Sequence, residues 1–352
     1  MIPERWLAAA LSPPRAWNDG PLATGALRSS PEDFVVDEIL GFEASGTGPH
    51  ALLTVRKRGA NTEWVARELA RAVGCKPFEV GFAGLKDRNA VTTQHFTVPR
   101  GKRTAAELVG IAGEGYEVLA SAEHQRKLPR GALAGNRFEI VVRGVDAPAG
   151  TLGERIGRIA AGGVPNYFGP QRFGRDAGNL EAVLREAGRL GECARRGRDD
   201  GFTLSAARSV IFNAVLAERV ARGDWNRLAP GDVANLDGRG SVFLVEALDE
   251  ALEARCDALE IHPTAPLPGE GESLSGGAVR ALEESVAVRF PEALAVIRAA
   301  RMNAERRALR MRVRDLEHEF ADGALRLRFS LASGSFATTV LREIIADADA
   351  GE

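Results

Sequence analysis

Residues 81–94 read Gly-Phe-Ala-Gly-Leu-Lys-Asp-Arg-Asn-Ala-Val-Thr-Thr-Gln, and the fold can be inferred outward from this stretch. Residues 78–82 alternate between apolar and other side chains, which is the period-two pattern of a strand with one buried face, and Gly84 ends that pattern. A second alternation covers residues 94–98. The sequence therefore predicts two strands, with Asp87 in the loop between them.

Asp87 lies between two cations, Lys86 and Arg88. Neighbouring cations favour the ionised form of a carboxylate, so this loop has the character of one that presents a reactive acid. The same residues also fit an Asx turn with solvated neighbours, because Asp and Asn are ordinary turn residues. The local sequence leaves both interpretations open.

The composition is that of a globular protein. The chain has 352 residues, which is longer than a usual single domain and favours two domains. Its 45% hydrophobic and 27% charged residues exclude a disordered or collagen-like chain. The formal net charge is -2 at pH 7, so there is no overall basic field, and any polyanion has to be bound by a local patch.

Cysteines, histidines and apolar runs bear on location and metal binding. Cys75, Cys193 and Cys256 are widely spaced, so the sequence predicts neither a disulfide framework nor a zinc site, and a reducing cytosol fits. The five histidines are scattered and add no metal-ligand spacing. No apolar run approaches membrane-spanning length, and the start of the chain lacks a basic segment ahead of an apolar one. We expect a cytoplasmic protein without a metal.

The chain is strand-rich at both ends and helix-rich in the middle. Residues 1–24, rich in Pro, Ala and Gly, are expected to be a loosely held lead-in. Alternating apolar residues predict further strands at 33–39, 51–56, 116–120, 138–142, 309–313 and 325–331. Capping signals and helical spacing predict helices at 62–74, 104–107, 151–162, 204–222, 278–310 and 338–346. This distribution predicts an α+β protein, in which residues 1–161 and 311–352 form one domain and residues 162–310 are inserted into it.

Five motifs, taken in order, resemble those of the TruD family of tRNA pseudouridine synthases. They are residues 31–36, 84–94, 135–138, 164–174 and 335–338, and the resemblance extends from about residue 25 to 345. It implies a mixed, largely antiparallel sheet shared by pseudouridine synthases, with residues 162–310 as a domain peculiar to the family. It also implies isomerisation of uridine 13 in the D arm of tRNA, without a metal, an organic cofactor or an obligate protein partner.

In this family the aspartate of the 84–94 motif is catalytic, and here that residue is Asp87. The reaction breaks the bond from N1 to C1′ of uridine, turns the uracil and joins its C5 to C1′. Asp87 can attack C1′, add to C6 or remove a proton from C2′, and the sequence does not decide among these. Arg28 matches a basic residue that the family places beside its Asp, although a surface arginine is the alternative. Lys86 and Arg88 are nearer along the chain, but neighbouring side chains in an extended loop tend to point apart.

An extruded base is held by stacking and by hydrogen bonds to its edge. Phe34, Phe138 and Phe336 are candidates for the stacking faces. Asn136 is the candidate for the edge, because its amide offers both a donor and an acceptor. Phe138 also fits a core position on an alternating strand. Phe336 lies in a small-residue turn before a predicted helix, where a large ring can project into a cleft.

Arginine-containing segments are candidates for contacts with phosphate. The 164–174 motif, with three aromatic residues and Arg172, fits packing between the two domains, which its position favours, or contact with RNA. Two further groups can form a phosphate-binding surface or merely a solvated face. They are Arg195, Arg196 and Arg198, and then Arg301, Arg306, Arg307, Arg310, Arg312 and Arg314.

Two functions of other classes stay open. The first is an RNA-binding protein without catalysis, which does not require the carboxylate of Asp87. The second is a hydrolase that uses Asp87 on another substrate, but no Ser-His or metal set accompanies it.

Overall fold

The structure is a computed structural model that describes residues 1–17, 20, 22–190 and 201–346. Its largest feature is a mixed sheet in the strand order β15-β16-β8-β2-β5-β3-β7-β6, with β1 beside β8 and β4 beside β5. The strands are β1 (Ala26–Leu27), β2 (Phe34–Ile39), β3 (His50–Arg58), β4 (Gly81–Phe82), β5 (Val91–Pro99), β6 (Ala112–Gly113), β7 (Tyr116–His124), β8 (Gly135–Arg143), β15 (Arg314–Ala321) and β16 (Ala324–Ala332). β2 and β5 run parallel, whereas the other neighbours along this order are antiparallel. The predicted α+β class with a largely antiparallel sheet is confirmed.

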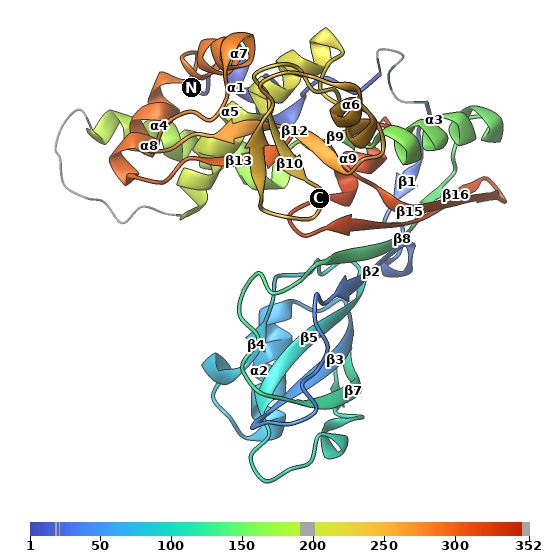
Figure 1. Cartoon of the computed structure of the whole chain (residues 1–352). Helices are drawn as coiled ribbons and strands as arrows, with labels where there is room; N and C mark the ends of the chain where they lie inside the picture. Colours follow the sequence, from blue (N-terminus) through green and yellow to red (C-terminus); the bar gives the residue numbers. More distant parts are fainter. Residues whose placement is uncertain (18–19, 21, 191–200, 347–352) are drawn as a thin grey trace.

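One half of the sheet packs against α2 (Thr62–Val73). Apolar side chains of β3, β5 and β7 form a core with the buried face of this helix. The helix begins after Asn61, as predicted, and ends at Gly74, whose φ of 76° is a left-handed conformation that glycine adopts at little cost. Figure 1 shows this half as the lower part of the molecule, with β2 and β8 leading up to β15 and β16.

The other half of the sheet packs against α3 (Ala149–Gly162) and α9 (Ala337–Leu341). Its core joins the inward residues of β2, β8 and β16 to apolar residues of these helices. Two short strands lie beside it, β9 (Val164–Pro165) and β14 (Arg310–Met311), and they pair antiparallel. The chain therefore leaves this half and returns to it at two adjacent points.

The central segment between these points has its own core. It contains the helices α4 (Gly178–Leu190), α5 (Gly201–Arg222), α6 (Glu250–Asp257), α7 (Gly277–Ala287) and α8 (Pro291–Ala300), and a sheet in the order β11-β10-β12-β13. The strands of that sheet are β10 (Val233–Leu236), β11 (Val242–Leu244), β12 (Ile261–Leu267) and β13 (Glu305–Ala308). The apolar residues of α5 are buried on nearly all sides of the helix, which shows that α5 lies in the middle of the other helices. The predicted domain limits at residues 162 and 310 stay a prediction.

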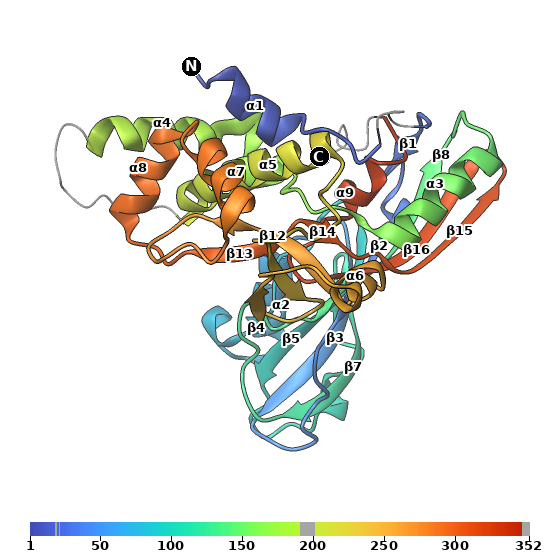
Figure 2. The ribbon, with the colours of Figure 1, turned by 45° about the horizontal axis from the view of Figure 1, so that its top comes forward.

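Residues 4–11 are not a loosely held lead-in, so this expectation is wrong for them. They form α1 (Glu4–Leu11), whose Trp6 is completely buried in the core of the central segment. The Trp6 ring lies 5.6 Å from that of Phe290, and Figure 2 shows α1 lying beside α5. Burial of one tryptophan ring removes a large apolar area from water, which explains why a short helix is held in place.

Prolines account for several differences between the predicted and observed elements. Residues 78–82 form a strand only at the end, because Pro77 starts a 3-10 turn in which Phe78 is 70% exposed. Residues 278–310 are two helices followed by two strands, because proline is tolerated in the first turn of a helix but not inside one, and Pro291 begins α8. α3 starts after Pro148, ahead of the predicted residue 151.

Three shorter elements also differ from their predictions. The capping contacts at residues 104–107 form, but they support only a 3-10 turn at Ala106–Leu108. The strand expected at 309–313 is limited to β14, and α9 ends at Leu341. Within the described ranges, no helix combines the length and apolarity that crossing a membrane requires.

Candidate active site

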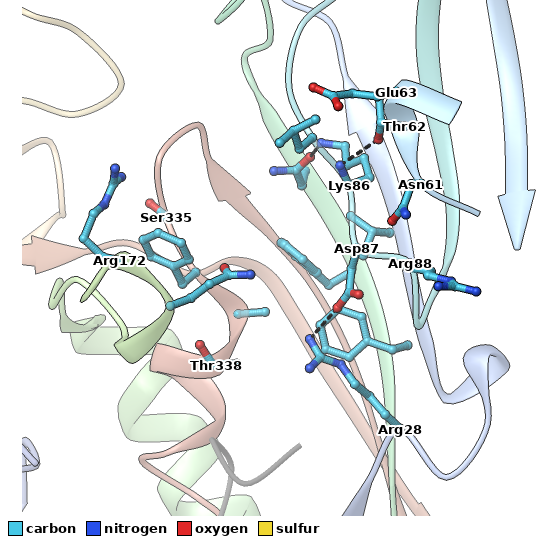
Figure 3. A pocket seen from close by; sticks show the side chains of 18 of the residues that line it. Arg28, Asn61, Thr62, Glu63, Lys86, Asp87, Arg88, Arg172, Ser335 and Thr338 are labelled. Carbon is cyan, nitrogen blue, oxygen red and sulfur yellow. Dashed lines mark hydrogen bonds and ion pairs between the residues drawn. The ribbon is translucent and has the colours of Figure 1, made fainter. Parts of the chain in front are cut away.

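A cleft of about 840 Å3 lies between the loop that carries Asp87 and the central segment. One wall is formed by the loop after β4 and by strands β2 and β8, and the other by residues 171–172 and 335–338. Figure 3 shows Asp87 on one wall, with Arg172, Ser335 and Thr338 on the other. All six residues singled out from the sequence line this cleft: Arg28, Phe34, Asp87, Asn136, Phe138 and Phe336.

The two carboxylate oxygens of Asp87 have different partners. Oδ1 accepts a hydrogen bond from the backbone N–H of Asn89 at 2.9 Å, which makes an Asx turn. Oδ2 lies 3.0 Å from Nη2 of Arg28, and the Asp87 side chain is 35% exposed. The two interpretations of this residue are therefore compatible, because the turn fixes one oxygen and leaves the other directed towards Arg28 and the cleft (Figure 3).

Arg28 is held by its backbone and by an aromatic ring. Its φ is 56°, which is uncommon for a residue other than glycine and occurs where the surroundings constrain the chain. Its guanidinium lies 4.3 Å from the centre of the Phe34 ring. A stacked and nearly buried guanidinium has few alternative positions, so the distance to Asp87 is well defined.

The cations next to Asp87 in sequence point elsewhere. Lys86 Nζ donates to Oδ1 of Asn136 and lies 3.4 Å from Oε2 of the buried Glu38. Burial lowers the pKa of Lys86, and the charge of Glu38 opposes this shift. Arg88 donates through Nε to the carbonyl oxygen of Gly59 at 3.1 Å. Lys86 therefore orients the amide of Asn136.

Lys57 supports the loop from beneath, and the sequence reasoning missed it. Its side chain is 1% exposed, and Nζ donates to the carbonyl oxygens of Asp87 at 2.7 Å, Lys86 at 3.3 Å and Ala60 at 2.9 Å. Burial lowers the pKa of Lys57 to about 8, and the charge of Asp87 opposes this shift. The sequence did contain a sign of this role. Lys57 follows Leu53 and Val55 on the buried face of β3, where an apolar residue is expected, and a lysine at such a position indicates a specific partner.

A second set of hydrogen bonds holds the start of the loop to α2 and β5. Gln94 donates through Nε2 to the carbonyl oxygen of Gly84 at 2.5 Å, and its Oε1 accepts from the hydroxyl of Thr62 at 3.0 Å. The Thr62 hydroxyl accepts from the N–H of Lys86 at 3.0 Å. Because Thr62 and Gln94 are fully buried, the loop is anchored on ordered elements.

The aromatic candidates differ in their surroundings. Phe34 and Phe138 are buried and meet edge to face at 6.3 Å, and Phe138 also stacks on Phe329 at 5.3 Å. Both rings therefore belong to the sheet core as well as to the cleft wall. Phe336 is half-buried and directly precedes α9 on the opposite wall.

The 164–174 motif contributes to both the core and the cleft. Tyr167, Phe168 and Phe173 are buried in the core of the central segment, as a packing role requires. Arg172, from the 3-10 turn Pro170–Phe173, extends to the cleft wall instead. A contact between this motif and RNA stays a prediction.

Comparisons with known proteins agree on one family. The family model described as tRNA pseudouridine synthase D (TruD) matches residues 17–185 and 201–344. The chain is 46% identical to tRNA pseudouridine synthase D of Methylococcus capsulatus, with 91% of each chain covered, and 43% identical to that of Pseudomonas aeruginosa, with 93% of each covered.

A solved structure has the same fold. The putative tRNA pseudouridine synthase D (TruD) from Methanosarcina mazei superposes with a TM-score of 0.73 over 98% of each chain, at 23% sequence identity. At that identity the likeness concerns the fold alone. The matched family model and the close relatives extend over nearly the whole chain, and so the protein belongs to the TruD family of tRNA pseudouridine synthases.

Proposed function

We propose that this protein converts uridine to pseudouridine in tRNA, at uridine 13 of the D arm, with the Asp87 carboxylate as the catalytic nucleophile or base. The observation that carries the proposal is the position of Asp87 at the cleft, with one carboxylate oxygen 3.0 Å from Arg28. Family membership supports tRNA as the substrate. A cleft of about 840 Å3 is large enough for one extruded nucleotide.

The chemistry is an isomerisation and requires no oxidant or energy source. The bond from N1 to C1′ breaks, the uracil turns within the cleft, and C5 bonds to C1′ before the proton on C5 leaves. Asp87 acts at C1′, at C6 or on the C2′ proton, and the three routes stay open. In each route Arg28 compensates the negative charge of the Asp87 carboxylate. The Asx turn holds the side chain in place, so that its second oxygen can reach the substrate.

The remaining cleft residues hold the base in this proposal. Phe34, Phe138 and Phe336 offer apolar faces from two opposite walls. Asn136, oriented by Lys86, hydrogen-bonds the uracil edge. In this proposal, a flipped uridine held in this way presents to Asp87 the atom on which it acts, whether C1′, C6 or the C2′ proton.

The proposal also covers organisation and location. The catalytic domain comprises residues 1–161 and 311–352, and residues 162–310 form the inserted domain. The enzyme acts in the cytoplasm without a cofactor or an obligate protein partner.

The test is the substitution Asp87→Asn, which keeps the size of the side chain and the Asx turn but removes the nucleophile and base. We expect pseudouridine formation to vanish, measured as tritium release from tRNA with 5-tritiated uridine, while tRNA binding and the fold persist. Mapping of the product locates the modified position. The matched control is Asp322→Asn, which removes one charge from the exposed turn between β15 and β16, at a φ of 53° that Asn also adopts.

Each outcome separates the candidate functions. Loss of turnover with intact binding supports the enzyme, and turnover close to that of the wild type removes Asp87 from the mechanism. A wild-type protein that binds tRNA but releases no tritium is a binding protein without catalysis. Joint loss of binding and folding in the variant assigns the Asp87 carboxylate a structural role.

A further inference from the structure

The arginines at residues 301–314 do not form the solvated basic surface that the sequence allowed. Most of them have partners within the protein. Arg301 pairs with Glu270, Arg306 pairs with Glu283, Arg312 and Arg314 pair with Asp237, and Arg310 is buried and donates to His262, Cys256 and Ile261. Arg195, Arg196 and Arg198 lie outside the described residues. Arg307 is the member of the run that remains to be explained.

Arg307 has neutral partners. Nη2 donates to Oδ1 of Asn166 at 2.6 Å and to the carbonyl oxygen of Gly334 at 3.1 Å. The guanidinium lies 4.2 Å from the centre of the Phe168 ring. Within the described ranges, no carboxylate lies within ion-pair distance of it. The contact with Gly334 places Arg307 beside the turn that carries Ser335 into the cleft wall.

Arg172 is a second cation at the same ring. Its guanidinium lies 5.2 Å from the centre of Phe168, and Nη1 donates to the hydroxyl of Ser205 at 3.0 Å. In the part of the chain that the structure describes, Nε is buried without a hydrogen-bond partner. Burial lowers the pKa of Arg172, and burial together with the charge of Arg172 lowers the pKa of Arg307 to about 9.

Two partly desolvated guanidinium groups beside one ring are costly without an anion. Like charges repel, and a buried charge is normally paired. Arg301, Arg306, Arg312 and Arg314 follow this rule with carboxylates, whereas among the described residues neither Arg172 nor Arg307 has a carboxylate within ion-pair distance. Arg310 shows that neutral acceptors can hold one buried arginine, but Arg172 and Arg307 bring two guanidinium groups to the same ring. An anion bound beside both groups would therefore offset the repulsion between them.

We propose that Arg172, on the cleft wall opposite Asp87, and Arg307, beside Gly334 at the same wall, form a subsite for one backbone phosphate of the RNA. Guanidinium groups match the oxygens of phosphate with paired hydrogen bonds. The hydroxyl-bearing residues Ser335 and Thr338 line the same wall, as Figure 3 shows, and supply further donors. A phosphate held here fixes the strand while the uridine is turned towards Asp87. This inference rests on the proposed function.

The first experiment measures the affinity for tRNA as a function of salt concentration. Each phosphate contact contributes about 0.7 to 0.9 to the slope of log affinity against log salt. Because the two arginines share one phosphate, the double variant Arg172→Gln and Arg307→Gln should lower the slope by about one contact and not two. Arg172→Lys keeps the charge and should retain most of the slope. Arg280→Gln, which removes an exposed arginine paired with Glu284 on α7, is the control and should leave the slope unchanged.

The second experiment identifies the phosphate. A series of tRNAs carries one neutral methylphosphonate linkage at each position around the target uridine. The wild type should lose affinity at one linkage, and the double variant should be insensitive to that same linkage.

The outcomes distinguish this subsite from the function itself. The subsite is refuted if the double variant has the same salt slope as the wild type, or if both lose the same affinity at every methylphosphonate linkage. In either case turnover by the wild type leaves the proposed function intact. Lower affinity at all salt concentrations with an unchanged slope, together with a lower free energy of unfolding, assigns the pair a structural role and also refutes it. A wild type without turnover on tRNA refutes the proposed function instead.

Discussion

Lys57→Met removes the ammonium group beneath the Asp87 loop and keeps a side chain of similar length. Nζ of Lys57 donates to the carbonyl oxygens of Lys86 and Asp87. A hydrogen bond from a charged donor contributes at least about 1.5 kcal/mol net. The two loop contacts therefore stabilise the observed position of the loop by about 3 kcal/mol relative to a relaxed one. At 1.36 kcal/mol for each factor of ten, the turnover number should fall by up to about 100-fold if the loop relaxes fully.

The assay is tritium release in a single turnover at saturating tRNA, with binding measured on the same protein. Binding should change little, because Lys57 is buried and lies behind the loop. Lys102→Met, which removes an exposed lysine, is the matched control. Wild-type turnover in a correctly folded Lys57→Met variant would show that the loop does not depend on this lysine.

The same variant makes a prediction about stability and pH. Burial lowers the pKa of Lys57 to about 8, from an ordinary value of 10.5. Between these values the unfolded chain holds the proton more tightly, so the folded state gains stability as the pH rises. Below pH 8 the cost of burying the charge is present in full. Urea unfolding should therefore show wild type gaining stability relative to Lys57→Met between about pH 8 and 10, and a constant difference at lower pH.

Three further substitutions test other parts of the molecule. Phe336→Ala should raise the activation free energy that kcat/KM reports by about 1–3 kcal/mol through loss of base stacking, measured by tritium release, and unchanged activity would remove the ring from the site. Arg28→Ala should lower turnover more than tRNA affinity, and equal losses would make it a binding residue. Burial raises the pKa of Asp237, but hydrogen bonds from His262 and Arg314 outweigh burial and hold it below its usual value. Asp237→Asn should therefore cost about 1–2 kcal/mol of unfolding free energy at neutral pH, and urea titrations should show the difference shrinking as the pH falls through the lowered value.

Local patterns determined the elements that carry the site. The alternation at residues 94–98 became β5. α2 begins after Asn61 and ends at Gly74, although the Asn61 side chain makes no capping hydrogen bond. Strand and helix periodicity and end signals are properties of neighbouring residues, which is why the sequence predicted these elements. The same rules failed at Phe78, where Pro77 imposes a 3-10 turn on an apparent strand. Family motifs identified Asp87 and Arg28, although the two are far apart in the chain.

Tertiary structure decided which side chains meet. The sequence holds Lys57 on a strand, Asp87 in a loop and Arg28 ahead of β2, but only the folded sheet brings them within hydrogen-bond distance. Tertiary structure also decided which arginines are paired with a carboxylate. Arg306 and Arg307 are adjacent in sequence, but Arg306 pairs with Glu283 whereas Arg307 donates to the carbonyl oxygen of Gly334. Charge pairing and burial depend on positions in space that residues from distant segments share, and no local pattern encodes those positions.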